Sequence, residues 1–79
     1  QDQAELDRYW NLLSAGGDPA ARQCGWLKDR FGLSWQVVPT AWLDMATSAN
    51  RPGVERAMAA LMQMKKLDIA ALQRAFDGR

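Results

Sequence analysis

The sequence predicts an α+β domain in which one helix packs on a β-hairpin and further helices follow. Three observations favour this fold. Apolar residues recur at helical spacing in residues 2–15, residues 24–39 form two short strands around a tight turn, and helical spacing returns after Pro39. A chain of 79 residues makes one small domain at most. Since an isolated hairpin is only marginally stable in water, we expect the helices, a second copy or further sequence to complete its burial.

The first expected helix spans residues 2–15. Asp2 is its predicted N-cap, and Glu5 stands three residues later, as in a capping box. Two glycines at positions 16 and 17 end the helix, and residues 18–22 form a loop. One apolar stripe is available to cover a sheet, and it consists of Leu6, Trp10 and Leu13.

The expected strands are residues 24–28 and 33–38, joined by a turn at residues 29–32. Asp opens this turn and Gly closes it, which favours an Asx hydrogen bond and a positive φ. If Lys28 lies opposite Leu33, then Trp26 lies opposite Trp35, and both indoles share one face. We therefore predict that both pack with Trp10 in one buried cluster. The opposite face would carry Gly25, Leu27, Ser34, Gln36 and Val38.

Helices are expected in the rest of the chain. Thr40 can cap a short helix over residues 41–47, and residues 48–53 form a linker that contains Pro and Gly. A helix from about residue 54 places Val54, Met58, Leu61 and Met62 on one side, and Asp68 caps a last helix with Ile69, Leu72 and Phe76. The predicted organisation is a module at residues 1–47, followed by a linker and C-terminal helices at residues 48–79.

Composition excludes several classes of partner. Ten Lys and Arg against nine Asp and Glu give a net charge of +1, which lacks the basic excess of nucleic-acid-binding domains. No apolar run approaches the roughly 20 residues that a membrane span needs. Cys24 is the only cysteine and cannot form an internal disulfide. We therefore expect no nucleic acid and no membrane as partners, and a reducing compartment, the cytoplasm.

The sequence lacks the residues of several common catalytic sites. It contains no His, so it cannot build a Ser–His, Cys–His or His–metal arrangement by itself. Its glycines form no dinucleotide or nucleoside triphosphate motif, and nothing local supports a site for S-adenosylmethionine. We assign no catalytic residue from the sequence.

The sequence resembles the PhnB-like family in three segments that follow the same order. These segments are residues 2–10 ahead of the two glycines, residues 23–39 and residues 64–72. This family carries the label 3-demethylubiquinone-9 3-methyltransferase domain and belongs to the vicinal oxygen chelate superfamily of glyoxalase and bleomycin-resistance folds. The resemblance implies part of a βαβββ module that begins at its helix. It also implies a small organic ligand in a cleft completed by a second module, from a homodimer or from missing N-terminal sequence.

Gln36 is the sharpest candidate that the resemblance provides. Enzymes of the superfamily carry a metal-binding Glu at the end of the strand after such a turn, and Gln36 stands in that place. A neutral amide neither offsets the charge of a divalent cation nor acts as a metal-linked base. We expect no metal or other cofactor from this chain, although the full-length protein could hold a divalent metal. The expected cleft residues are Gln36, Ser34, Leu27 and Gly25.

The resemblance leaves three functions open. The first is binding or sequestration of a small molecule, for which an uncharged Gln36 is tolerable. The second is a metal-dependent lyase, isomerase or dioxygenase-like enzyme whose metal ligands come from the missing module. The third is the methyltransferase of the family label, which gains no support from these residues. Whether the protein is an enzyme stays open at this point.

Overall fold

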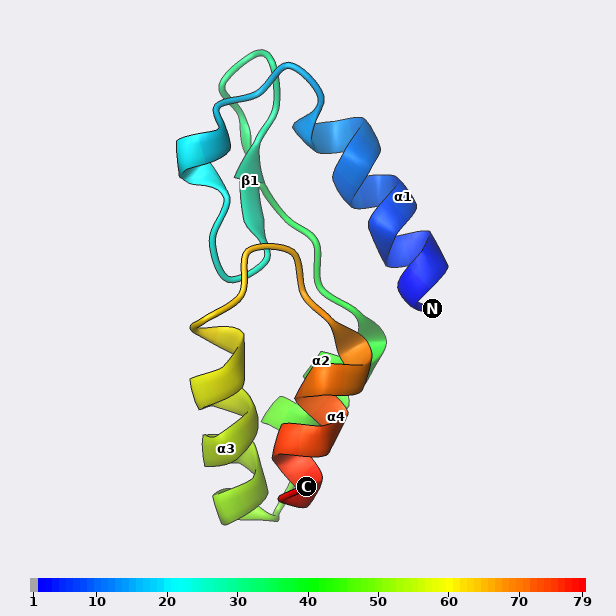
Figure 1. Ribbon diagram of the computed structural model, residues 1–79, viewed down its shortest axis with the longest axis vertical. Helices are drawn as coiled ribbons and strands as arrows, with labels where there is room; N and C mark the ends of the chain where they lie inside the picture. The colour runs from blue at the N-terminus through cyan, green and yellow to red at the C-terminus, as the bar shows by residue number, and fades with distance from the viewer. Residues whose placement is uncertain (1) are drawn as a thin grey trace.

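The computed structural model describes residues 2–79 and confirms the α+β class. The molecule is elongated, with extents of 39 × 21 × 19 Å. Helix α1 and the hairpin lie at one end, and helices α2 to α4 lie at the other (Figure 1). In chain order the elements are α1 (Gln3–Ser14), the 3₁₀ helix η1 (Pro19–Ala21), β1 (Trp26–Lys28), β2 (Ser34–Gln36), α2 (Thr40–Ala46), α3 (Arg51–Leu61) and α4 (Ile69–Asp77).

Helix α1 forms as the sequence predicts. The Asp2 carboxylate accepts a hydrogen bond from the Glu5 amide at 2.9 Å, which satisfies one of the free donors of the first turn. Leu6 and Trp10 are buried and Leu13 is half-buried, so the predicted stripe faces the core. The chain leaves the helix through Gly16, whose φ of 76° favours glycine.

The hairpin forms, but the predicted register is wrong by one residue. Leu27 lies opposite Trp35, and Trp26 lies opposite Gln36 instead of Trp35. The reason is the length of the loop. The Asp29 amide donates to the Leu33 carbonyl at 2.9 Å, so only three residues lie between the paired positions, and the last of them, Gly32, has a φ of 82°. Three-residue hairpin loops of this kind end with a left-handed residue.

The one-residue shift separates the tryptophans. Trp10 is buried, whereas 48% of Trp26 and 42% of Trp35 are exposed, so the predicted three-tryptophan cluster is wrong. Side chains alternate between the two faces of a strand. A shift of one position therefore changes which residues of β1 share a face with a given residue of β2. Leu27, only 1% exposed, joins Leu6 and Trp10 in the core in place of the indoles.

Helices α2 and α3 begin differently from the prediction. The N-cap of α2 is Pro39, without a side-chain hydrogen bond, so Thr40 is the first helical residue rather than the cap. Helix α3 begins inside the expected linker, because the Asn50 side chain accepts from the Gly53 amide at 3.3 Å and Pro52 suits the first turn of a helix. Only residues 47–50 separate α2 from α3.

Helices α3 and α4 pack closely through small residues. A Cβ added to Gly53 would lie 3.0 Å from the Phe76 carbonyl oxygen, so glycine allows the close approach at this crossing. The buried residues of α3 are Gly53, Ala57 and Leu61. Met58 and Met62 are exposed, which corrects the predicted stripe. The N-cap of α4 is confirmed, since the Asp68 carboxylate accepts from the Ala71 amide at 3.1 Å.

The connection between α3 and α4 joins the two ends of the molecule. Its Met64 and Lys65 carbonyls accept the amides of Cys24 and Gly25, each at 2.8 Å. Leu67 follows and is completely buried in the core. The segment that leads into β1 is therefore hydrogen-bonded to the connection between α3 and α4.

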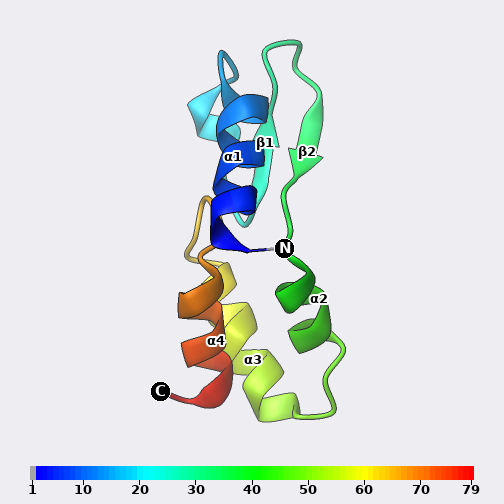
Figure 2. The same ribbon diagram turned by 90° about the vertical axis from the view of Figure 1, so that its right-hand side faces the viewer.

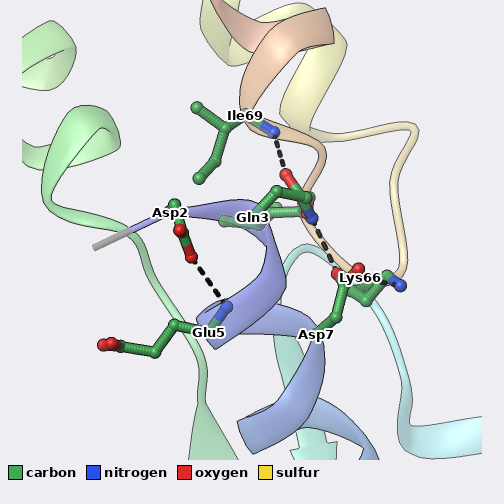
Figure 3. A network of polar contacts seen from close by, with 7 residues as sticks. Asp2, Gln3, Glu5, Asp7, Lys66 and Ile69 are labelled. Carbon is green, nitrogen blue, oxygen red and sulfur yellow. Dashed lines mark hydrogen bonds and ion pairs between the residues drawn. The ribbon is translucent and has the colours of Figure 1, made fainter.

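Gln3 makes the second link between the ends, and Figure 3 shows it. Its amide nitrogen donates to the Leu67 carbonyl at 3.0 Å and to the Asp7 carboxylate at 2.8 Å, while its oxygen accepts from the Ile69 amide at 2.7 Å. Asp7 also pairs with Lys66 at 3.0 Å. One side chain of α1 thus satisfies backbone groups on both sides of the α4 N-cap.

Candidate functional site

The two faces of the hairpin have different surroundings. On the inner face Leu27 and Val37 are buried, and Leu27 packs in the core with residues of α1. Trp35 belongs to this face but remains partly exposed. We call the opposite side the outer face and define it by four exposed residues of the two strands, Trp26, Lys28, Ser34 and Gln36.

Cross-strand pairing brings the outer-face residues together in two pairs. Trp26 lies opposite Gln36, and Lys28 lies opposite Ser34. Side chains of directly opposite residues have Cβ atoms about 4.5–5.5 Å apart. An indole ring and an amide are therefore neighbours, with a hydroxyl and an ammonium group next along the strands.

The structure divides the four cleft residues that were predicted from the sequence. Ser34 and Gln36 lie on the outer face, whereas Gly25 and Leu27 are buried on the inner side. Gly25 has a φ of 84°, and a Cβ there would lie 3.2 Å from Leu67. The four side chains do not share one face, because the predicted register was shifted. A role of Ser34 and Gln36 in ligand binding stays a prediction.

Trp26 and Lys28 are the outer-face residues that the sequence analysis did not assign to this face. Both follow from the register that the three-residue loop sets. The signal was Gly32, whose left-handed conformation can end a three-residue loop as well as a four-residue turn. With the shorter loop, alternation places Trp26 beside Gln36.

Asp29 organises the turn rather than a reaction centre. Its carboxylate accepts from the Trp35 indole at 2.9 Å and from the Leu33 and Phe31 amides at 3.0 and 2.9 Å. These hydrogen bonds, the indole first, and the positive charge of Arg30 hold the pKa of Asp29 below its usual value, although partial desolvation opposes them. Asp29 is therefore a carboxylate at neutral pH, and it fixes the loop that sets the register.

The outer face is an open surface. The hollow beside the hairpin turn has a volume of about 270 Å³ and includes none of its four residues. Its lining consists of Leu12, Leu13, Ala15, Asp29, Arg30 and Phe31. Since binding sites for small molecules are concave and bury most of the ligand, the outer face needs an opposing wall to enclose one.

Two further observations concern metals and membranes. Among residues 2–79, no three His, Cys, Asp or Glu side chains are grouped so that they could hold a metal ion. In the same part of the chain, no helix has the length and apolar character to cross a membrane.

Fold and site together define the chain as a helix-backed hairpin module with an open polar and aromatic face. Residues 1–38 match the sequence model of the family described as 3-demethylubiquinone-9 3-methyltransferase. This match covers α1, η1 and the hairpin and agrees with the family predicted from the sequence. Helices α2 to α4 lie beyond the match. A search of curated proteins found no match to the chain.

Proposed function

We propose that the chain is a ligand-binding module whose outer face forms one wall of a cleft for a small organic molecule. A second module supplies the other wall. The observation that carries this proposal is the exposed Trp26–Gln36 pair on a hairpin whose other side is occupied by the core. The resemblance of the sequence to the vicinal oxygen chelate superfamily supports it further, because that superfamily builds ligand clefts from paired modules.

The outer face suits a small planar molecule with oxygen substituents. The Trp26 ring offers a flat apolar surface, and Gln36 offers both a donor and an acceptor beside it. Lys28 and Ser34 add a positive charge and a hydroxyl group next along the strands. Because the Gln36 amide cannot take up a proton, this face is better suited to binding than to proton transfer at that position.

A ligand-detected NMR experiment with catechol and 4-hydroxybenzoate as probes tests the proposal. We expect saturation transfer from the 79-residue protein to both probes, and its loss in Trp26→Ala and in Gln36→Ala. Both residues are exposed, so these variants should remain folded. Leu43→Ala, which changes an exposed apolar residue of α2, is the control and should keep the signal. Equal signals in all variants would show that the probes bind elsewhere.

We also place the protein in the cytoplasm. Support comes from Cys24, which is a free thiol, as is usual in a reducing compartment. Fractionation of the source cells tests this, and recovery of the protein outside the cytoplasmic fraction would contradict it.

A further inference from the structure

A second hollow lies between η1 and the connection from α3 to α4. Its volume is about 340 Å³, and its lining comes from residues within 19–23 and from residues 62–65. Figure 2 shows both segments on the side of β1 away from β2. None of the four outer-face residues lines this hollow. A site here is therefore separate from the site of the proposed function.

Backbone hydrogen bonds hold the two walls of the hollow together. The Cys24 and Gly25 amides, which follow the first wall, donate to the Met64 and Lys65 carbonyls of the second wall, each at 2.8 Å. The hollow is thus formed before any molecule binds. Binding would not have to order the two segments, and this lowers its cost.

The charged residues that line the hollow, Arg22 and Lys65, are both cations. Within residues 2–79, neither side chain forms an ion pair with a carboxylate. The carboxylates that flank the two walls in the sequence, Asp18 and Asp68, are the N-caps of η1 and α4. Two positive charges without a negative partner on the walls of one hollow favour an anionic ligand.

Arg22 is held in place by one hydrogen bond and keeps a donor without a partner. Its Nη2 donates to the Ser14 carbonyl at 3.1 Å. Its Nε is buried and has no hydrogen-bond partner among residues 2–79. Buried N–H groups without a partner are rare in folded proteins, because they have lost their bonds to water. A guanidinium binds a carboxylate through two parallel hydrogen bonds, so an oxyanion beside Arg22 would supply the missing acceptor.

The rest of the lining selects the kind of anion. Phosphate sites usually depend on several free backbone N–H groups, whereas the amides of residues 20–23 and 62–64 all have partners within the chain. The second wall adds the apolar and adaptable side chains of Met62 and Met64. We propose that this hollow binds the carboxylate of a small molecule with an apolar substituent. Arg22 and Lys65 contact the carboxylate, and the two methionines contact the substituent.

A titration with hexanoate, followed by ¹H–¹⁵N NMR, tests this site. We expect saturable shifts of the Arg22 Nε–H signal and of the amide signals of residues 62–65. The dissociation constant should be about millimolar for so small a molecule. Hexanol, which has the same chain without the charge, and inorganic phosphate, which has the charge without the chain, should each bind about tenfold more weakly or less.

Two matched variants separate a specific contact from general attraction by charge. Lys65→Gln and Arg74→Gln each remove one positive charge from an exposed residue, and both should remain folded. Only Lys65 lines the hollow. We expect the dissociation constant of hexanoate to rise about two- to fivefold in Lys65→Gln and to stay unchanged in Arg74→Gln.

Arg22→Gln should raise the dissociation constant about tenfold or more, because the charged fork is lost. Arg22→Lys keeps the charge without the fork and should recover only part of the affinity. Both variants also lose the bond to the Ser14 carbonyl, so circular dichroism must show that they are folded. If they are not, the Lys65→Gln pair and the Arg22 Nε–H signal still decide the question.

Each result supports or overturns the site. Hexanoate binding without a shift of the Arg22 Nε–H signal overturns it, and so does an equal effect of Lys65→Gln and Arg74→Gln. Phosphate that binds as tightly as hexanoate overturns the assignment to a carboxylate. Shifts confined to the Trp26 and Gln36 side chains would place hexanoate on the outer face, so that the proposed function gains support and this site fails.

Discussion

The two ends of the molecule treat their large apolar residues in opposite ways. The contrast concerns the aromatic residues: Trp42 of α2 is buried and Phe76 of α4 is half-buried, whereas three aromatic residues of the hairpin are exposed. The buried examples are Trp42, Met45, Leu61 and Leu72, and the exposed ones are Trp26, Phe31, Leu33 and Trp35. The exposed aromatic residues of the hairpin agree with the proposal that this end contacts a ligand.

The shape of the chain agrees with this division. Its radius of gyration is 12.9 Å, while a compact domain of this length has about 11.6 Å. The ends nevertheless share one core, because Leu67 from the helical connection is buried together with Leu6 and Leu27. We therefore expect both ends to unfold in one transition, and the predictions below test how strongly each contact contributes.

The largest effect is expected for Trp10→Ala. This indole is buried between α1 and the core, so its removal should cost about 3–5 kcal/mol of unfolding free energy. For a domain of this size, each kcal/mol lowers the melting temperature by about 4–8 °C. Trp35→Ala, at the margin of the hairpin, should cost about 1 kcal/mol, because it removes an exposed ring and the hydrogen bond to Asp29.

Thermal unfolding monitored by circular dichroism measures both tryptophan variants. Both variants are compared at the same protein concentration. If Trp35→Ala costs as much as Trp10→Ala, the hairpin end is packed more tightly than the structure shows and the contrast between the ends is wrong.

Gly17→Ala tests the cover of the β1 edge. The added methyl group would overlap the Lys28 carbonyl, and a backbone shift is needed to relieve it, at a cost of about 1–3 kcal/mol. Gly32→Ala is the contrasting variant. No atom lies within 4 Å of a Cβ there, so its cost of about 1–2 kcal/mol comes from the positive φ alone.

Hydrogen exchange separates the two glycine variants, since stability alone does not. Gly17→Ala should speed the exchange of the Trp26 amide, which bonds to Gln23 at the covered edge. Gly32→Ala should speed exchange in the turn and leave that amide protected. Unchanged protection of Trp26 in Gly17→Ala would mean that the glycine does not hold this edge.

Gln3→Ala should weaken the link between the ends. The variant loses the bonds to the Leu67 carbonyl and the Ile69 amide in a half-buried place, and a cost of about 1–3 kcal/mol follows from leaving these groups unpaired. Gln63→Ala is the matched control on an exposed residue after α3 and should change stability by less than about 0.5 kcal/mol. Urea unfolding compares the two, and equal midpoints would show that water replaces the Gln3 contacts.

Local features of the fold were predictable from the sequence. The caps at Asp2 and Asp68 were correct, because each depends on a side chain and an amide three residues apart. The start of α3 was missed, since Pro52 and Gly53 are typical of loops as well as of a first helical turn. The Asn50 cap was a local signal that the sequence analysis did not use, and the close contact with α4 appears only in the structure.

The candidate site was predictable only in part. Ser34 and Gln36 were predicted to point away from the core, and both are exposed. Trp26 was assigned to the wrong face because a difference of one residue in the length of the loop changes the register of the hairpin. The hydrogen bond between Gln3 and Ile69 joins residues that are 66 positions apart, and a single sequence does not indicate that two such distant residues are in contact.

The smallest effect concerns Asp7 and appears only in acid. The hydrogen bond from Gln3, and after it the contact with Lys66, hold the pKa of Asp7 below its usual value in the folded chain. A carboxyl group whose pKa is lowered by folding contributes stability above its unfolded pKa, and this contribution is lost as the pH falls through the folded value.

Urea midpoints measured between neutral pH and strong acid should thus decline less steeply for Asp7→Asn than for the unmodified chain. Some decline must persist, because Asp29 and Asp77 also have lowered pKa values. Gln63→Ala changes an exposed residue without a charge and should retain the full slope. An unaltered slope in Asp7→Asn would show that solvent screens the contacts of this exposed carboxylate, and that the link between the ends depends on Gln3 and Leu67 instead.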